Sequence, residues 1–347
     1  MTTISDIARL AGVSKTAVSK VINGHADIGE ATRRKIMNIM AELNYRPSVL
    51  ARGLTLGKSW LIAVCLFPDQ AHMSGRAHNL ESRFYGPIIN SCNDYLSQRD
   101  YDLLVLSSNP TTRENAGVWY RDKLQERRVD GYILISHVSQ LAALATLNEV
   151  QIPRMCLGIK MPGFRSAYIE SNNYRGAHQG VQYLHTLGHR RIALIGDTNS
   201  SMSGRHRMQG ALQAVREYGL TIPDGAITYG DFSRHAGSDA MKSMAEIIRS
   251  ERVTVVFAFN DYMAFGAIDA AHELGMSVPG DISVMGFDDV ELAADFHPAL
   301  TTIRQNTAVM GEIIGESLIK LIEDSQFEPP EVMVDTTLVI RSSVSPA

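Results

Sequence analysis

Five polar residues near the start of the chain recur at the spacing of one helix face. They are Lys15, Thr16, Ser19, Lys20 and Asn23. Ammonium, hydroxyl and amide groups in such a row can donate hydrogen bonds to base edges and phosphates when a helix lies in the major groove of DNA. The plainer alternative is a small helical hairpin with a solvated polar face, and the polar row alone does not exclude it.

The apolar residues around this row predict two short helices. The two stripes at helical spacing are Ile4, Ile7, Ala8 and Ala11, then Val18, Val21 and Ile22. Gly12 separates the stripes, and Ser14 suits the N-cap of the second helix. Two helices joined by a tight turn that contains Gly are typical of a helix-turn-helix, whose second helix reads the major groove.

Two further helical segments follow. Residues 30–43 predict a third helix, and Glu30 is favourable in its first turn because of the helix dipole. The residues expected to face inward are Ile36, Met37, Met40 and Leu43. Pro47 can begin another helix, but only about two turns are available before Gly57, and helices this short are marginal alone in water. We expect residues 46–54 to be helical only when something holds them.

Charge is unevenly divided along the chain. Residues 1–60 carry nine Lys or Arg and four Asp or Glu, a net charge of +5; the remainder carries 24 against 33, a net charge of −9. A basic head on an acidic body is typical of a nucleic-acid-binding module attached to a part that does not bind nucleic acid.

Composition excludes several classes of protein. Hydrophobic residues make up 45% and charged residues 20% of the 347 residues, as in a globular protein of two or three domains. No apolar run reaches the length of a membrane span, and the start of the chain does not resemble a signal peptide. Cys65, Cys92 and Cys156 form no C-x-x-C pair, so neither a disulfide framework nor a zinc site is indicated. Reduced thiols fit a cytoplasmic location.

From Trp60 onward, short apolar runs alternate with helical patterns. The runs cover residues 61–67, 101–107, 129–135, 154–159, 191–196, 255–259 and 282–287. The helical patterns cover residues 86–98, 113–127, 174–187, 204–218, 234–249, 261–274 and 306–322. This alternation predicts an α/β fold of parallel sheets with helices on both faces. Seven such runs favour two lobes over a single sheet.

The segment that begins at Asp6, D-I-A-x-x-A-G-V-S-x-x-A-V-S-K-V-I-N, resembles the N-terminal signature of the LacI/GalR (lactose-repressor/galactose-repressor) family of bacterial transcription regulators. Ala17 stands where Thr is usual, and Lys20 where Arg is usual. Lys keeps the charge but lacks the bidentate fork that suits guanine, which affects the expected operator sequence. Weaker landmarks follow in family order: R-R-V-D-G at 127–131, L-G-H-R-R-I at 187–192, F-N-D at 259–261, G-F-D-D at 286–289 and P-A-L-T-T-I at 298–303.

This resemblance implies a helix-turn-helix head, a hinge helix and a two-lobed core like a periplasmic binding protein, built of parallel sheets. The expected domains are residues 1–45, 46–59 and 60–347. Because the chain of this family crosses between the lobes three times, lobe one is expected at about 60–160 and 306–327. Lobe two is expected at about 161–305 and 328–347, with a strand at 337–340. The absence of a Leu heptad at the end favours a dimer.

The resemblance also assigns DNA-binding residues. Lys15, Thr16 and Lys20 are expected to contact bases or phosphates, with Ser14, Ser19 and Asn23 in support. In the hinge, Ala51 and Leu54 match the family, while Ser48 replaces the usual Asn. The implied role of Leu54 is to wedge between bases in the minor groove and kink the duplex.

An effector is expected beyond the carboxyl ends of the strands, where open α/β sheets bind ligands. Arg207 of R-H-R-M-Q-G and Asp261 of F-N-D match the family's effector contacts. The further candidates are Phe232 in G-D-F-S, Gln305 at a lobe crossover, Asn172, Asp69 and Lys160. Each has a structural alternative: an ion pair for Arg207, a core position for Phe232, and a helix cap for Asp261.

Other features of the core have plainer explanations. Residues 70–83 lengthen a loop that is usually short in the family; they either reshape the pocket or form a surface loop. His72 and His78 in this loop lack a third metal ligand at useful spacing. Asp288 and Asp289 could pass for a catalytic carboxylate pair, but we interpret them as capping a turn. No catalytic motif is present, and no cofactor is indicated.

Taken together, these patterns predict a homodimeric regulator, most often a repressor in this family, and not an enzyme. Its expected partners are a near-palindromic duplex operator and a small effector, a sugar or a nucleoside-like metabolite, with no membrane involved. Two alternatives stay open: an effector that is a phosphorylated carrier protein, and an enzyme or transport-binding protein with a vestigial head.

Overall fold

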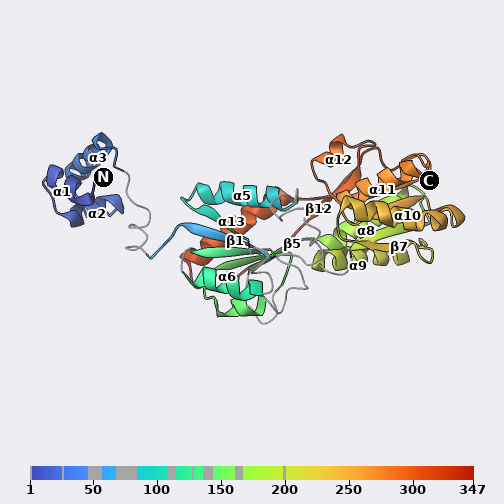
Figure 1. The fold of residues 1–347 in the computed structure, drawn as a ribbon, viewed down its shortest axis with the longest axis horizontal. Helices are drawn as coiled ribbons and strands as arrows, with labels where there is room; N and C mark the ends of the chain where they lie inside the picture. The colour runs from blue at the N-terminus through green and yellow to red at the C-terminus, as the bar shows by residue number, and fades with distance from the viewer. Residues whose placement is uncertain are drawn as a thin grey trace. The chain divides into compact units, whose positions relative to one another are not determined.

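The computed structural model describes residues 2–25, 27–45, 57–67, 84–107, 115–126, 129–135, 144–160, 167–197 and 201–347. The chain divides into two compact units, Met1–Trp60 and Leu61–Ala347 (Figure 1). The two units are described separately below.

Among its described residues, the first unit has three helices. They are α1 (Ile4–Ala11), α2 (Lys15–Ile22) and α3 (Glu30–Glu42). Thr3 and Asp6 close a capping box at the start of α1, and Gly12 ends this helix with φ of 68° in the left-handed region. Ser14 caps α2, because its Oγ accepts a hydrogen bond from the Ala17 amide at 3.1 Å. These caps produce the tight turn of the expected helix-turn-helix.

The core of this unit is narrow. Ile7, Val18 and Ile36 are fully buried, and Met40 is 8% exposed. The prediction that Met37 and Leu43 face inward is wrong, because they are 53% and 36% exposed. With only two short helices beneath it, α3 buries a single i, i+4 row, and side chains outside that row stay at the surface.

The second unit contains two sheets. The first sheet consists, in spatial order, of β11 (Glu331–Val334), β5 (Ala167–Ser171), β4 (Arg154–Leu157), β3 (Gly131–Ile135), β1 (Leu61–Leu66) and β2 (Asp102–Ser107). All neighbouring pairs in this sheet are parallel. The second sheet consists of β12 (Thr336–Val339), β10 (Thr301–Gln305), β9 (Ser283–Asp288), β8 (Val255–Ala258), β6 (Ile192–Asp197) and β7 (Ile227–Gly230). Here β12 is antiparallel to β10.

Helices cover both sheets. Around the first sheet are α5 (Tyr85–Ser97), α6 (Ala116–Gln125), the 3₁₀ turn η3 (Thr146–Glu149) and α13 (Thr307–Glu323). Around the second are α8 (Asn173–Thr186), α9 (Met202–Glu217), α10 (Arg234–Ser250), α11 (Asp261–Glu273) and the short α12 (Leu292–Asp295). The helices pack as pairs, α5 with α13, α8 with α9 and α10 with α11 (Figure 1). Because crossovers between parallel strands are right-handed, α9 lies on the face opposite α10 and α11.

The chain passes between the sheets three times, after β5, after β10 and after β11. The expected lobe boundaries differ from this in two places. β5 pairs with β4, and β11 pairs with β5, so both strands belong to the first sheet although we placed them in lobe two. The expected boundary at residue 160 came from the lobe crossings of the family, whereas this chain adds one more parallel strand, β5, before its first crossing.

Among the described residues, none of the helices has both the length and the apolar composition needed to cross a bilayer.

Candidate functional site

The outward face of α2 carries the polar row of the first unit. Lys15 and Thr16 are exposed, while Ser19 and Lys20 are half-buried. Val18 and Val21 point the other way into the core. The helix therefore presents donors on one side and an apolar anchor on the other, as a major-groove reading helix requires.

Members of the predicted DNA-binding set also make contacts within the head. The Ser14 hydroxyl caps α2. Asn23 donates from Nδ2 to Ser19 Oγ at 3.4 Å. The predicted hinge contacts Ala51 and Leu54 lie outside the described residues.

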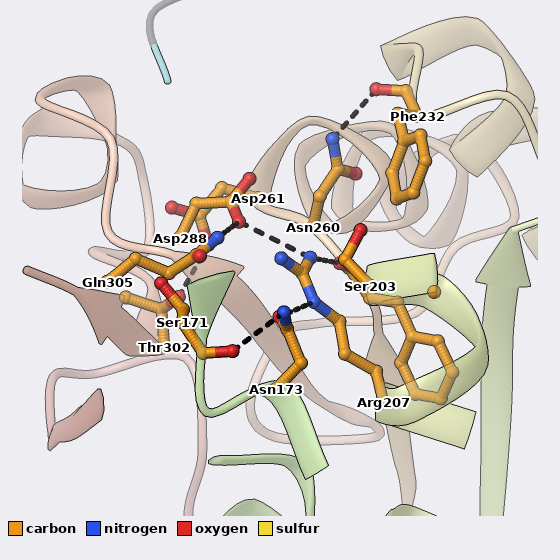
Figure 2. A network of polar contacts seen from close by, with 12 residues as sticks. Ser171, Asn173, Ser203, Arg207, Phe232, Asn260, Asp261, Asp288, Thr302 and Gln305 are labelled. Carbon is orange, nitrogen blue, oxygen red and sulfur yellow. Dashed lines mark hydrogen bonds and ion pairs between the residues drawn. The ribbon is translucent and has the colours of Figure 1, made fainter. Parts of the chain in front are cut away.

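In the second unit, polar side chains gather where the strands end. Four polar residues lie at the carboxyl ends of strands: Glu170 in β5, Asp197 in β6, Asp288 in β9 and Gln305 in β10. Asn260 lies two residues after the end of β8. Carboxyl ends of parallel strands share one edge of a sheet, which is where open α/β folds bind ligands. Figure 2 shows this network around the side chain of Arg207.

Arg207 on α9 is the centre of the network and is only 4% exposed. Its Nε donates to Asn173 Oδ1 at 2.7 Å, and its Nη1 donates to the Phe259 carbonyl oxygen. The guanidinium also stacks on Phe287, 3.8 Å from the ring centroid. Burial lowers the pKa of Arg207, while nearby carboxylates, Asp288 first, oppose that shift. A guanidinium fixed in this way is pre-oriented for hydrogen bonding to a ligand.

Asp288 is the carboxylate that faces Arg207. Arg207 Nη1 lies 3.3 Å from Asp288 Oδ1, and Gln305 Nε2 donates to the same oxygen at 2.6 Å (Figure 2). Burial raises the pKa of Asp288 to about 6, against the effect of Arg207. Asp288 Oδ2 has no hydrogen-bond partner among the described residues. It is therefore available as an acceptor beside a donor, which is the arrangement that a hydroxyl group needs.

Asp261, which we predicted as the effector contact, lies beneath this network. It is 0% exposed. Its Oδ2 accepts from the Val290 amide at 2.8 Å, and its Oδ1 accepts from Thr302 Oγ1 at 2.5 Å. Burial, followed by the nearby Asp288 charge, raises its pKa well above the usual value. Asp261 is thus enclosed by its donors, while the neighbouring Asp288, with a side chain 10% exposed, is the carboxylate that faces Arg207.

The remaining predicted contacts are distributed around the edge of the network. Phe232 is half-buried with φ of 67°, and its carbonyl oxygen accepts from Asn260 Nδ2 at 2.9 Å (Figure 2). Asn172 caps α8 by accepting from the Arg175 amide at 3.2 Å. Lys160 is paired with Glu331 at 2.6 Å, and Asp69 lies outside the described residues.

A second polar group extends the network from Arg207. Asn173 donates from Nδ2 to Glu170 Oε1 at 2.8 Å, and His206 Nδ1 lies 3.3 Å from the same oxygen. Tyr168 also donates to Glu170, which is 2% exposed. The hydrogen bond to Glu170 raises the pKa of His206. Glu170 belongs to the first sheet and His206 to α9, so this group joins the two lobes.

Sequence reasoning missed Asp288, Asn173 and the Glu170–His206 pair. The G-F-D-D landmark carried a signal for Asp288, because the first Asp of that motif ends a strand. Asn172 is the N-cap of α8 and Asn173 is the first residue of this helix. It is Asn173, and not Asn172, that contacts the guanidinium of Arg207. No sequence signal connects Glu170 with His206, which lie 36 positions apart.

One hollow lies away from this network. It has a volume of about 430 Å³ and is lined by residues that include Arg252, Thr254 and Asp281. Thr254 precedes β8, so the hollow lies at the amino ends of the strands, opposite the edge at which ligands bind in such folds.

Comparison with known proteins agrees with both units. Residues 3–48 match the family described as bacterial regulatory proteins, lacI family, and residues 181–344 match the periplasmic binding protein-like domain. The chain is 30% identical over 348 residues to the HTH-type transcriptional regulator DegA of Bacillus subtilis (strain 168), covering 99% of this chain and 98% of that protein. It is 33% identical over 349 residues to the HTH-type transcriptional repressor PurR of Klebsiella pneumoniae (strain 342), covering 99% and 97%.

Solved structures show the same architecture. The lac repressor dimer bound to operator and the anti-inducer ONPF matches with a TM-score of 0.80 at 27% identity, over 99% of each chain. The complex of the transcriptional regulator CelR with cellobiose matches with a TM-score of 0.72 at 27% identity, over 99% of this chain and 100% of that one.

A helix-turn-helix head followed by two parallel-sheet lobes defines a DNA-binding transcriptional regulator with an effector-binding domain, not an enzyme. The chain belongs to the LacI family of bacterial regulatory proteins.

Proposed function

We propose that this protein acts in the cytoplasm as a homodimeric repressor that binds a near-palindromic operator. A two-fold protein presents two copies of α2, so its binding site carries two matching half-sites. Lys15, Thr16 and Lys20 contact bases or phosphates in this proposal, and Ser14, Ser19 and Asn23 position them. The segment 46–59, with Ala51 and Leu54, supplies the minor-groove contact.

We further propose that an uncharged, hydroxyl-bearing metabolite such as a sugar or nucleoside binds between the lobes and changes operator affinity. Arg207 donates to a ligand hydroxyl, and Asp288 Oδ2 accepts from one. Gln305 and Asp261 hold these groups in place, Phe232 covers an apolar face of the ligand, and Asn172 and Asp69 line the edge. Coupling between such sites is typically about 1–3 kcal/mol.

The observation that carries this proposal is the buried Arg207–Asp288 pair. It lies at the carboxyl edge of the second sheet and is hydrogen-bonded to Gln305, the residue directly before a crossing between the lobes. A ligand that binds Asp288 is therefore connected, through Gln305, to a segment that joins the two lobes.

The experiment begins with the wild-type full-length protein. It is used to select an operator from a pool of random duplexes, and a thermal-shift screen of sugars and nucleosides then identifies an effector. Arg207→Lys keeps the charge but loses the guanidinium fork. We expect it to weaken effector binding at least about tenfold while operator affinity without effector stays within about twofold.

Arg216→Lys makes the same exchange at an exposed position of α9 and serves as the control. Full effector response in Arg207→Lys would remove Arg207 from the effector site. Selection of no duplex by the wild type would instead contradict the operator half of the proposal.

A further inference from the structure

Asp27 contacts the DNA-reading face of α2 through an ion pair. The Lys20 Nζ donates to Oδ2 of Asp27, which lies in the loop between α2 and α3. The two side chains retain 40% and 55% of their exposure, so both reach solvent. The Lys20 hydrogen bond and charge hold the pKa of Asp27 below its usual value, and its carboxylate is therefore ionised at neutral pH.

The other acidic residues of the head have different positions. Asp6 closes the capping box of α1 and pairs with Arg9 at 3.4 Å. Glu30 pairs with Arg34 along α3 at 3.5 Å, and Glu42 is the last residue of that helix. Among the described residues of the head, Asp27 is thus the acid that pairs with a residue of the polar row.

An ionised carboxylate at this place opposes DNA binding in two ways. It occupies the Lys20 ammonium that would otherwise meet a phosphate or base acceptor. It also brings a negative charge within a Debye length, about 8–10 Å, of the phosphates. On an operator, Lys20 must leave Asp27 to reach a base acceptor, so binding loses the full free energy of the ion pair. On random sequence, Lys20 gains at most a phosphate contact, so binding loses no more than this amount.

We propose that Asp27 lowers the DNA affinity of the head: its carboxylate competes with DNA for the Lys20 ammonium and weakens operator binding at least as much as binding to random sequence. This proposal depends on the DNA-binding activity of the family and not on the effector site.

The test compares full-length wild type with Asp27→Asn. Fluorescence anisotropy measures binding to a random-sequence duplex and to a duplex selected from a random pool by the wild type. An exposed ion pair corresponds to about a two- to fivefold change in affinity. We expect Asp27→Asn to bind the selected duplex about two- to fivefold more tightly, with an equal or smaller gain for random duplex. Thermal unfolding of both proteins checks that the head stays folded.

Two controls separate this role from a general charge effect. Glu42→Gln removes the same charge from the head without touching Lys20, and we expect a smaller gain. In a Lys20→Ala background the ion pair is already absent, so Asp27→Asn should no longer increase DNA affinity in the way it does in the wild type. This comparison is a double-mutant cycle. The proposal is overturned if Glu42→Gln gains as much, if the gain persists without Lys20, or if the random duplex gains more than the selected duplex. Failure of the wild type to bind any duplex would instead refute DNA binding itself.

Discussion

Adjacent carboxylates in this protein have different roles because their partners differ. Asp288 faces Arg207 and Gln305 and keeps one oxygen unpaired within the described residues. Its neighbour Asp289 lies 2.6 Å from Arg304 Nε and 2.7 Å from Arg341 Nη1. The second pair ties the end of the chain to the second sheet. Asp289 is thus structural, as the sequence suggested, whereas Asp288 belongs to the buried network around Arg207.

The Glu170–His206 contact makes stability depend on pH. Glu170 raises the pKa of His206 in the folded protein, so its stabilising contribution is present below the unfolded value of about 6.5. The contribution is lost as pH rises through the folded pKa. We expect His206→Gln, which cannot titrate, to lose about 1–2 kcal/mol at pH 6 and less at pH 8, measured by urea unfolding.

His235→Gln provides the matched control for this prediction. His235 pairs with Asp239 at 3.2 Å, but its side chain is 88% exposed. Exposed pairs contribute little, so we expect the unfolding curves of this variant to follow those of wild type at both pH values. A His206→Gln deficit that does not change with pH would show that packing, and not charge, is responsible.

At the residue scale, sequence reasoning identified single side chains better than pairs. Arg207 and Gln305 lie in the buried network, because their motifs place them at a helix start and a strand end. The choice between Asp261 and Asp288 depended on which carboxylate the Val290 and Thr302 donors enclose. That depends on contacts across more than 25 positions, which no local pattern encodes.

At the scale of elements, glycines allow the paired helices to approach closely. A Cβ at Gly210 of α9 would lie 2.0 Å from the Tyr174 carbonyl oxygen of α8, and one at Gly311 of α13 would lie 2.3 Å from the Ile88 carbonyl oxygen of α5. The neighbour is backbone in both cases and cannot rotate away. These helices therefore pack backbone against backbone.

Gly210→Ala tests this packing. The added methyl group must push α8 away from α9, and we expect a loss of about 3 kcal/mol or more in the free energy of unfolding. Gly180→Ala in α8 is the control, because its nearest atoms are Met285 Cε and Phe257 Cζ at 3.1 Å. Side-chain ends can move, and Ala favours a helix by about 1 kcal/mol, so a small change is expected there. Equal losses in the two variants would contradict the backbone explanation.

Element prediction was accurate where periodicity was strong. All seven expected helical segments of the second unit correspond to helices, and all seven apolar runs correspond to strands. The sequence analysis did not predict β5, β7, β10 or β11 as strands. β7 and β11 are edge strands of four residues with exposed positions. The sequence of β10, T-T-I-R-Q, contains a single apolar residue. Their β structure comes from pairing with neighbours and not from hydrophobic alternation.

At the scale of the whole molecule, the division of charge predicts that operator and effector affinity respond differently to salt. The head carries +5 and the remainder −9. Each phosphate neutralised contributes a slope of about −0.9 in log affinity against log salt. We expect operator affinity to fall by about 10³ or more between roughly 50 and 200 mM salt. Effector affinity should change little, because the Arg207–Asp288 pair is buried and poorly screened. Parallel titrations of both ligands on one preparation would check this, and a flat operator profile would argue against phosphate contacts.

The three passages of the chain between the sheets restrict how new regulators can be assembled from this one. Each lobe is made of separate stretches of sequence, so a single recombination point anywhere between β1 and β12 would divide the strands of at least one sheet between the two halves. The boundary after Trp60 interrupts neither sheet. Chimeras that graft this sensing body onto a different reading head should therefore be joined at residues 57–60, and joints placed farther along should yield protein that does not fold.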